Sequence, residues 1–160
     1  MNKNKLTKIL GFSVFILFIS TSMIPSSASN NVVDKLCITI FNGKTLFVGG
    51  NGPGNYTSIQ SAIDDAEFGD TIFVYDDSSP YNETLSIYKS INLFGEKNET
   101  TKIIGSSSGD VVNITADWIN LSGFTIQNSG SNGIDAGIEI HSQFNSIIDN
   151  IVIDNDCGIR

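Results

Sequence analysis

The chain has 160 residues, of which 40% are hydrophobic and 16% charged, and its nine Lys and Arg against 17 Asp and Glu give a net charge of −8. This length is enough for one domain with a hydrophobic core. The acidic balance argues against a nucleic-acid or anionic-lipid partner, because binding to phosphates depends on cationic side chains that release counterions.

Residues 1–28 are predicted to be a secretory signal peptide. Three lysines near the start precede an almost wholly apolar run at 9–19 and small residues at 26–28, which is the order typical of such signals. The apolar run is shorter than the roughly 20 residues that span a bilayer, which favours cleavage after Ala28 over an uncleaved membrane anchor. The mature chain would hold six basic and 17 acidic groups, and we expect it to be secreted or at the cell surface, with no membrane span.

A hairpin and a glycine-rich loop are predicted for residues 29–56. The β-prone runs Leu36–Phe41 and Thr45–Val48 flank Asn42-Gly43, a pair that favours a type I′ turn. The glycines at 49–54 are not followed by the Gly-Lys-Ser/Thr order of a phosphate-binding loop, so this run is interpreted as a linker.

The segment 57–160 is predicted to hold a capping helix and the first rungs of a β-helix. Thr57 and Gln60 have the spacing of a capping box, and the apolar residues that follow share one helix face: Ile59, Ala62, Ile63 and Ala66. From Thr71 onward, runs of three to five β-prone residues alternate with Gly, Asn, Ser and Asp. Such strands are too short for a parallel sheet with helical crossovers, and they fit a parallel β-helix.

Two internal repeats support this interpretation. The pattern Ile91–Gly95 returns as Ile119–Gly123, and the pattern of positions 121–128 returns at 148–155. Periods of about 20–50 residues indicate a stacked repeat. We therefore predict an all-β fold, a right-handed parallel β-helix with an N-terminal capping α-helix, truncated at its C-terminal end.

The second repeat predicts which side chains stack. An inner column would pair Leu121, Phe124 and Ile126 with Ile148, Ile151 and Ile153, and a turn ladder would pair Asn128 with Asn155. A leucine-rich repeat is the alternative. Its asparagine comes three positions after the last apolar residue of the pattern, whereas here the asparagine comes two positions after it.

Two segments carry a resemblance to a known family. Residues 46–71, which end in Gly69-Asp70-Thr71, and residues 89–96 resemble the start of right-handed parallel β-helix proteins of the pectate-lyase-like superfamily, in particular its NosD-like branch. The resemblance implies that the helix caps the N-terminal end and that Gly69-Asp70-Thr71-Ile72 leads into the first full rung. It implies no single activity, because the superfamily includes lyases, hydrolases, epimerases, sugar-binding modules and surface spacers.

No catalytic, metal or cofactor site is predicted. The NosD name implies copper, but both methionines lie in the signal segment and His141 is the only histidine. Lyases of this fold use acidic residues to hold calcium and an Arg or Lys as base, whereas here the only arginine is Arg160 and no lysine follows Lys102. The run 154–156 could offer calcium ligands, although a turn is the simpler interpretation.

Two kinds of covalent modification remain open. Cys37 and Cys157, the only cysteines, could form a disulfide in an exported protein or remain buried thiols. N-glycosylation patterns occur at four candidate asparagines, and a fifth match inside a strand is weaker; the four are Asn55, Asn82, Asn98 and Asn113.

These observations favour an exported, non-catalytic β-helix that binds carbohydrate or another cell-envelope component, or serves as a scaffold. Tyr75, Tyr81, Tyr88 and Trp118 could offer stacking rings to a polysaccharide or could pack the rungs. Because the last rung would lack a cap after Arg160, we expect the chain to be the N-terminal part of a larger protein with downstream domains. The alternatives are a polysaccharide lyase or glycoside hydrolase with catalytic rungs beyond Arg160, and a NosD-like accessory factor for copper-enzyme maturation.

Overall fold

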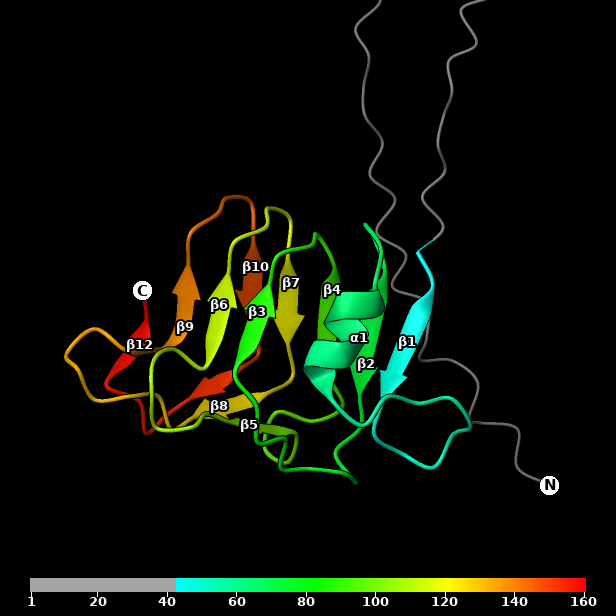
Figure 1. Cartoon of the computed structure of the whole chain (residues 1–160), viewed down its shortest axis with the longest axis horizontal. Helices are drawn as coiled ribbons and strands as arrows, with labels where there is room; N and C mark the ends of the chain where they lie inside the picture. Colours follow the sequence, from blue (N-terminus) through cyan, green and yellow to red (C-terminus); the bar gives the residue numbers. More distant parts are fainter. Residues whose placement is uncertain (1–42) are drawn as a thin grey trace, which may run out of the picture. The chain divides into compact units, whose positions relative to one another are not determined.

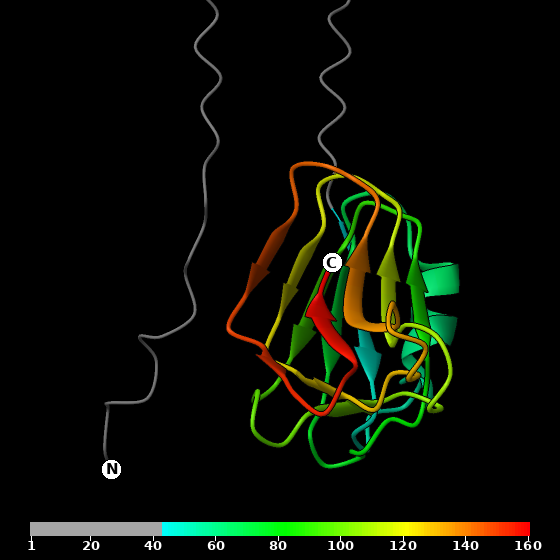
Figure 2. The same ribbon diagram turned by 90° about the vertical axis from the view of Figure 1, so that its left-hand side faces the viewer.

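The computed structural model describes residues 43–160, in which successive coils stack along one axis and their strands form three parallel sheets around the core (Figures 1 and 2). Sheet A has the order β1 (Thr45–Val48), β2 (Thr71–Val74), β4 (Asn92–Gly95), β7 (Asn120–Ser122) and β10 (Ser146–Ile148). Sheet B has the order β5 (Lys102–Ile104), β8 (Thr125–Gln127) and β11 (Ile151–Val152). Sheet C has the order β3 (Leu85–Ile87), β6 (Val112–Ile114), β9 (Ala136–Ile140) and β12 (Cys157–Ile159).

Successive coils pass through the sheets in the order A, B and C, and the core lies between the sheets. Side chains alternate along each strand, so that Ile72 and Val74 of β2 are fully buried while Phe73 between them is partly exposed. The inward residues of neighbouring coils stack in columns, such as Leu93 on Leu121. The prediction of a right-handed parallel β-helix is confirmed.

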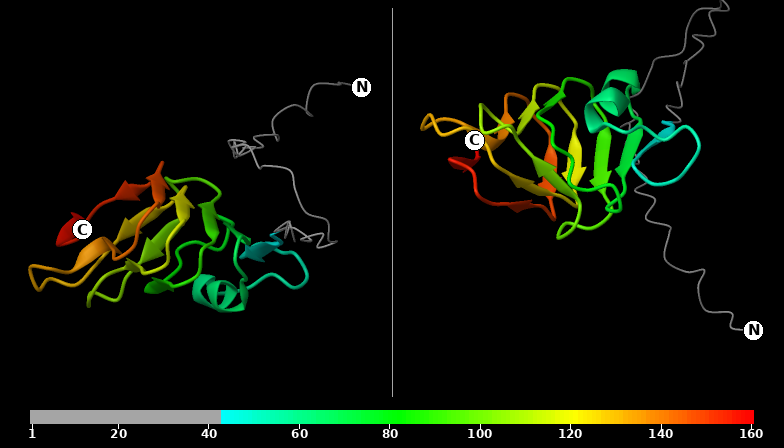
Figure 3. Two further views of the ribbon diagram at one scale, coloured as in Figure 1. Left: turned by 90° about the horizontal axis from the view of Figure 1, so that it is seen from above. Right: turned by 60° about the horizontal axis from the view of Figure 1, so that its bottom comes forward.

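The helix α1 (Ile59–Asp65) lies at the N-terminal end of the solenoid (Figure 3). It continues the row β12, β9, β6 and β3 and packs against β1, β2 and β3 (Figure 1). Three of its four predicted inward residues are fully buried, and Ala66, just past its end, is 3% exposed. The helix therefore takes the place of a sheet C strand in the first coil and covers the end of the core.

The N-cap of α1 is Ser58 and not the predicted Thr57. The Ser58 hydroxyl accepts the Ser61 N–H at 3.3 Å. The Glu83 carboxylate, which comes from the segment before β3, accepts the N–H groups of Ile59 and Gln60 at 2.9 and 3.0 Å. A carboxylate from the next coil therefore satisfies two of the free N–H groups of the helix, which a capping box within the helix would not predict.

The first of the two repeats gives the correct register. Asn92 pairs with Asn120 and Leu93 with Leu121, as the repeated pattern predicts. Gly95 lies against Gly123, where a Cβ atom on Gly95 would come within 2.1 Å of the Gly123 carbonyl oxygen. Because only two glycines fit at this approach, the glycines help to fix this register.

The second repeat predicts a register that is wrong by one position. Leu121 pairs with Ile147 and not with Ile148, Thr125 pairs with Ile151, and Ile126 pairs with Val152. The predicted inner stacking partners are therefore wrong: Ile148 is 63% exposed and Ile153 45% exposed, and Ile151 lies beside Thr125. Of the predicted column, Leu121, Phe124 and Ile126 are fully buried, as expected.

The turn ladder is corrected in the same way. Asn128 and Asp154 both have positive φ, of 69° and 53°, and the Asn128 N–H donates to the Asp154 carbonyl. Asn155 instead accepts the Ser129 N–H at 3.0 Å and donates to the Ile126 carbonyl, also at 3.0 Å. The difference arises because apolar residues alone do not define a register where two isoleucines are adjacent, at 147 and 148.

Three evenly spaced corner asparagines hold the last coil to the one before it. Asn145, Asn150 and Asn155 accept backbone N–H groups of the preceding coil, at distances of 2.9, 3.1 and 3.0 Å. Two of them also donate back, Asn150 to the Leu121 carbonyl and Asn155 to the Ile126 carbonyl. These paired bonds satisfy backbone groups at the bends, where the strand ladder is interrupted.

Several predictions fall on residues 1–42, outside the described residues. They are the signal peptide, the first arm of the hairpin at 36–41 and Cys37. The second arm of the hairpin is β1, which pairs in parallel with β2. Cys157 is partly exposed, with its sulfur 4.0 Å from the Gly133 carbonyl oxygen. The one helix within residues 43–160 is too short to cross a membrane.

Candidate functional site

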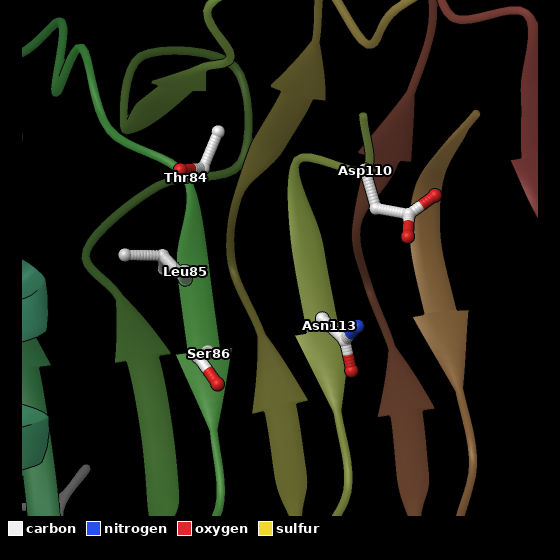
Figure 4. A pocket seen from close by; sticks show the side chains of 5 residues that line it. All are labelled: Thr84, Leu85, Ser86, Asp110 and Asn113. Carbon is white, nitrogen blue, oxygen red and sulfur yellow. The ribbon is translucent and has the colours of Figure 1, made fainter. Parts of the chain in front are cut away.

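Three adjoining hollows run across the outer surface of the first coils, and we refer to them together as the trough. The first, of about 390 Å³, lies over sheet B and is lined by Asp76, Ser79, Pro80, Glu99, Thr100, Lys102, Ile104 and Gln127. The second, of about 260 Å³, shares Ile104 and is lined further by Asn82, Glu83, Thr84, Gly105 and Ser106. The third, of about 250 Å³, shares Thr84 and adds Leu85, Ser86, Asp110 and Asn113 from sheet C (Figure 4).

Polar residues line much of the trough, most of them in turns and some at outward positions of the short strands. Ser86 and Asn113 are the middle residues of β3 and β6, directly opposite each other in the register, and their side chains stand on adjacent strands (Figure 4). The flanking residues Leu85 and Val112 point inward and are buried. The alternation of the strands therefore places a hydroxyl and an amide side by side on the outer face.

Asn113 has an amide oxygen without a partner. Oδ1 is shielded from solvent and makes no hydrogen bond with any described residue. A buried polar atom in this state costs roughly 1–3 kcal/mol. Most such atoms in proteins are satisfied, and the amide that carries this unsatisfied oxygen belongs to a residue that lines an open hollow.

The carboxylates of sheet C are already engaged. Asp110 Oδ1 accepts the Ala136 N–H at 2.8 Å. Glu139, beside Asn113 in the register, is 5% exposed and accepts from Arg160 Nε at 2.6 Å. The Glu139 carboxylate also lies 3.3 Å from His141 Nε2, and its hydrogen bond raises the pKa of Arg160. These groups tie neighbouring coils together.

The far end of the trough holds an exposed ion pair. Lys97 Nζ donates to Asp76 Oδ2 at 2.7 Å, and the Thr100 hydroxyl donates to the same oxygen at 2.8 Å. These bonds, with that from Lys97 first, lower the pKa of Asp76 to about 2. Asp76 is therefore ionised at neutral pH and is not a candidate general acid.

The predicted glycosylation sites lie in different surroundings. Asn82 and Asn113 both line the trough, where Asn82 is exposed and Asn113 is partly buried. The Nδ2 group of Asn55 donates to the Gly49 carbonyl at 2.6 Å, and that of Asn98 donates to Asp149 Oδ1 at 2.9 Å. The Asn82 amide makes only a long hydrogen bond, to the Pro80 carbonyl at 3.5 Å, so modification at Asn82 would cost less than modification at Asn55 or Asn98.

The four aromatic residues considered for stacking do not form one surface. Tyr81 is buried, donates to the Tyr75 carbonyl at 2.7 Å, and its burial raises its pKa to about 12. Tyr88 donates to Asp64 on α1 at 3.0 Å. Trp118 is 59% exposed and stacks on Phe144, a residue that the sequence alone does not single out.

Within residues 43–160, no three His, Cys, Asp or Glu side chains converge in a way that could hold a metal ion. The run 154–156 forms a bend in which Asp154 is exposed and the Asp156 N–H donates to the Ser129 hydroxyl at 3.0 Å. Its asparagine, at 155, is used by backbone groups of the preceding coil.

The comparisons with known proteins give similarity in fold. No protein-family model and no curated protein matches the sequence. The crystal structure of the pectin methylesterase from Aspergillus niger is 18% identical with a TM-score of 0.47, over 63% of this chain and 42% of that one. The pectin methylesterase PemA from Erwinia chrysanthemi is 15% identical with a TM-score of 0.46, over 67% of this chain and 43% of that one. The chain thus spans less than half the length of either enzyme.

Proposed function

We propose that this protein is an exported β-helix that binds a polysaccharide in the trough. The observation that carries the proposal is that Asn113, whose buried Oδ1 has no partner among residues 43–160, lines a solvent-open polar hollow. The hydroxyl groups of a sugar are suitable donors and acceptors for such a wall. The amide can also turn about its last torsion, which exchanges the positions of Oδ1 and Nδ2.

The shape of the trough supports a polymer as the ligand. The three hollows adjoin through Ile104 and Thr84, so the surface is long and shallow and differs from an enclosed cavity for a small molecule. Polar side chains occur along all three parts, which suits a ligand that presents hydroxyl groups at regular intervals. The proposed assignment to the NosD-like branch rests on residues 46–71 and 89–96 and agrees with export.

Binding is favoured over catalysis by the state of the acidic groups. Glycosidases need two carboxylates on either side of the scissile bond. On sheet C, Asp110 holds the backbone of β9 and Glu139 holds Arg160. A hydrolase or lyase with further rungs and a copper-enzyme accessory factor remain the alternative predictions.

Glycan binding by the full chain tests this proposal. Isothermal titration with cellohexaose, xylohexaose, mannohexaose and hexagalacturonate covers neutral and acidic polymers. For whichever oligosaccharide binds, Asn113→Ala should weaken the affinity by roughly threefold to tenfold, the value of one hydrogen bond. Asn51→Ala is the matched control, since Asn51 is an exposed asparagine on the glycine-rich loop. If none of the four binds, or if both variants bind like the unmodified protein, the proposal is wrong.

A further inference from the structure

The bend between sheets C and A carries an exposed pair of stacked aromatic rings. The Trp118 and Phe144 ring centroids are 4.5 Å apart and the ring planes differ by 16°. Trp118 is 59% exposed and Phe144 64% exposed. Large aromatic side chains usually bury most of their surface, so two of them stacked in the open form an apolar surface without an internal packing role.

Both residues have a backbone conformation that large side chains seldom adopt. Their φ angles are 62° for Trp118 and 60° for Phe144. For bulky residues a positive φ is uncommon and costs of the order of 1–3 kcal/mol, and such residues cluster at functional sites. Gly69 occupies the position equivalent to Trp118 two coils nearer the N-terminus. Its φ is 85°, a conformation that glycine adopts without this cost.

The bend around the two rings is held by bonds between the last two coils. The Trp118 N–H donates to the Gln143 carbonyl at 3.2 Å, and the Gln143 N–H donates to Asp117 Oδ1 at 2.8 Å. The next residue, Ile119, donates its N–H to Asn145 Oδ1 at 2.9 Å. These hydrogen bonds hold the backbone of both aromatic residues in place. The protein therefore loses less conformational entropy when a ligand stacks on the rings.

The register leaves one face of the indole open. Asn92 pairs with Asn120, so Ser90 is the residue beside Trp118 in the preceding coil, and Phe144 is the residue beside it in the following coil. Phe144 covers one face of the indole, and the equivalent residue of the preceding coil, Ser90, has no aromatic ring to cover the other. The large exposed fraction of Trp118 agrees with an open second face.

We propose that the pair Trp118–Phe144 is a stacking subsite for a neutral pyranose ring, which rests on the proposed polysaccharide binding. A pyranose presents a flat face of C–H groups to an aromatic ring, and its equatorial hydroxyls then reach outward. Two polar residues directly precede the rings in the sequence and can offer partners for those hydroxyls, Asp117 before Trp118 and Gln143 before Phe144. The Gln143 amide makes no hydrogen bond with any residue from 43 to 160.

The surrounding charge selects among flat ligands. Nucleic-acid bases also stack on aromatic rings, but their phosphates need cationic side chains, and Asp117 beside the rings together with the net charge of −8 opposes them. The same carboxylate disfavours acidic sugars. Neutral hexoses are therefore the expected occupants.

Fluorescence of the tryptophan tests the subsite directly, because Trp118 is the only tryptophan in the chain. Titration of the full chain with cellohexaose and mannohexaose should give a saturable change in emission, whereas hexagalacturonate should give a change only at much higher concentration. By calorimetry, Trp118→Ala should bind the neutral sugar roughly tenfold more weakly, and Trp118→Phe should recover most of the affinity. Tyr88→Ala, at another exposed aromatic residue, is the control and should bind normally.

The outcomes separate this proposal from the binding in the trough. Calorimetric binding that depends on Asn113 but leaves the emission unchanged overturns the subsite and keeps the trough. An emission change that Phe144→Ala abolishes and Asn113→Ala does not affect keeps the subsite and overturns the trough. Stronger binding of hexagalacturonate, or equal quenching by tetramethylammonium, overturns the assignment to neutral sugars, and no response in either assay overturns both proposals.

Discussion

Replacement of the corner asparagine Asn150 by alanine should loosen the last coil. Its Oδ1 accepts the N–H of Phe124, a fully buried residue, at 3.1 Å. Its Nδ2 donates to the carbonyls of Leu121 at 2.8 Å and Ile148 at 3.0 Å. Alanine removes all three bonds and leaves the Phe124 N–H without an acceptor.

The expected loss follows from the two kinds of bond. An orphaned buried donor costs roughly 1–3 kcal/mol, and an ordinary hydrogen bond contributes about 0.5–1.5 kcal/mol. Since the carbonyls of Leu121 and Ile148 can still meet other donors or water, we expect a total loss of about 2–3 kcal/mol. Asn120→Ala is the control, because Asn120 is exposed and, among residues 43–160, its side chain bonds only to Asn92, at 2.6 Å. This control should lose no more than about 1 kcal/mol.

Two measurements check the prediction. Urea denaturation gives the free energy of unfolding, and amide hydrogen exchange followed by NMR gives the protection of the Phe124 N–H, which detects local opening of a solenoid end. Asn150→Ala should lower both, and Asn120→Ala should leave the protection of Phe124 unchanged. Equal stabilities of the two variants, together with an unchanged exchange rate at Phe124, would refute the role assigned to the corner asparagines.

Three further predictions concern the register, the helix cap and the acid stability. Ile147→Ser should destabilise the protein by about 1–2 kcal/mol more than Ile148→Ser in urea denaturation, because only Ile147 packs against the core; equal losses would contradict the pairing of Leu121 with Ile147. Glu83→Ala should cost about 1–2 kcal/mol, because α1 loses two capping bonds, and an unchanged circular dichroism melting curve would contradict this. Since the pKa of Asp76 is lowered from 3.8 to about 2, its pairing stabilises the fold above pH 3.8 and this stabilisation is lost as the pH falls toward 2. Asp76→Asn should therefore flatten the pH dependence of the urea midpoint in that window, and an unaltered slope would contradict the Lys97 pairing.

The fold class could be predicted because the sequence repeats both apolar and corner residues. The first repeat predicts the correct register, because its pattern includes Asn92 and Gly95, whose positions are fixed by a side-chain ladder and by a close approach of two backbones. The pattern of the second repeat consists mainly of apolar residues. Where Ile147 and Ile148 are adjacent, either can be taken as the inward residue, and the backbone bonds decide between them.

The candidate site could be predicted only in part. An isolated Asn113 in a β-prone run gives no signal that its oxygen lacks a partner, because that depends on side chains from neighbouring coils. The sequence offers Trp118 as a stacking ring but does not single out its partner Phe144, since the two lie on successive coils and only the register brings them together. An alignment that placed Leu121 beside Ile147 would have paired the two rings from the sequence.

The bends between sheets B and C differ in length from coil to coil, and this has a consequence for engineering. They comprise residues 105–111, 128–135 and 153–156, yet the strands on either side keep their pairing. Around Gly133, in the longest of these bends, an added Cβ atom would meet nothing within 4 Å. A foreign peptide or an affinity tag inserted at this position should be tolerated without loss of the parallel ladder, so the scaffold can display new sequences at a defined height along its axis.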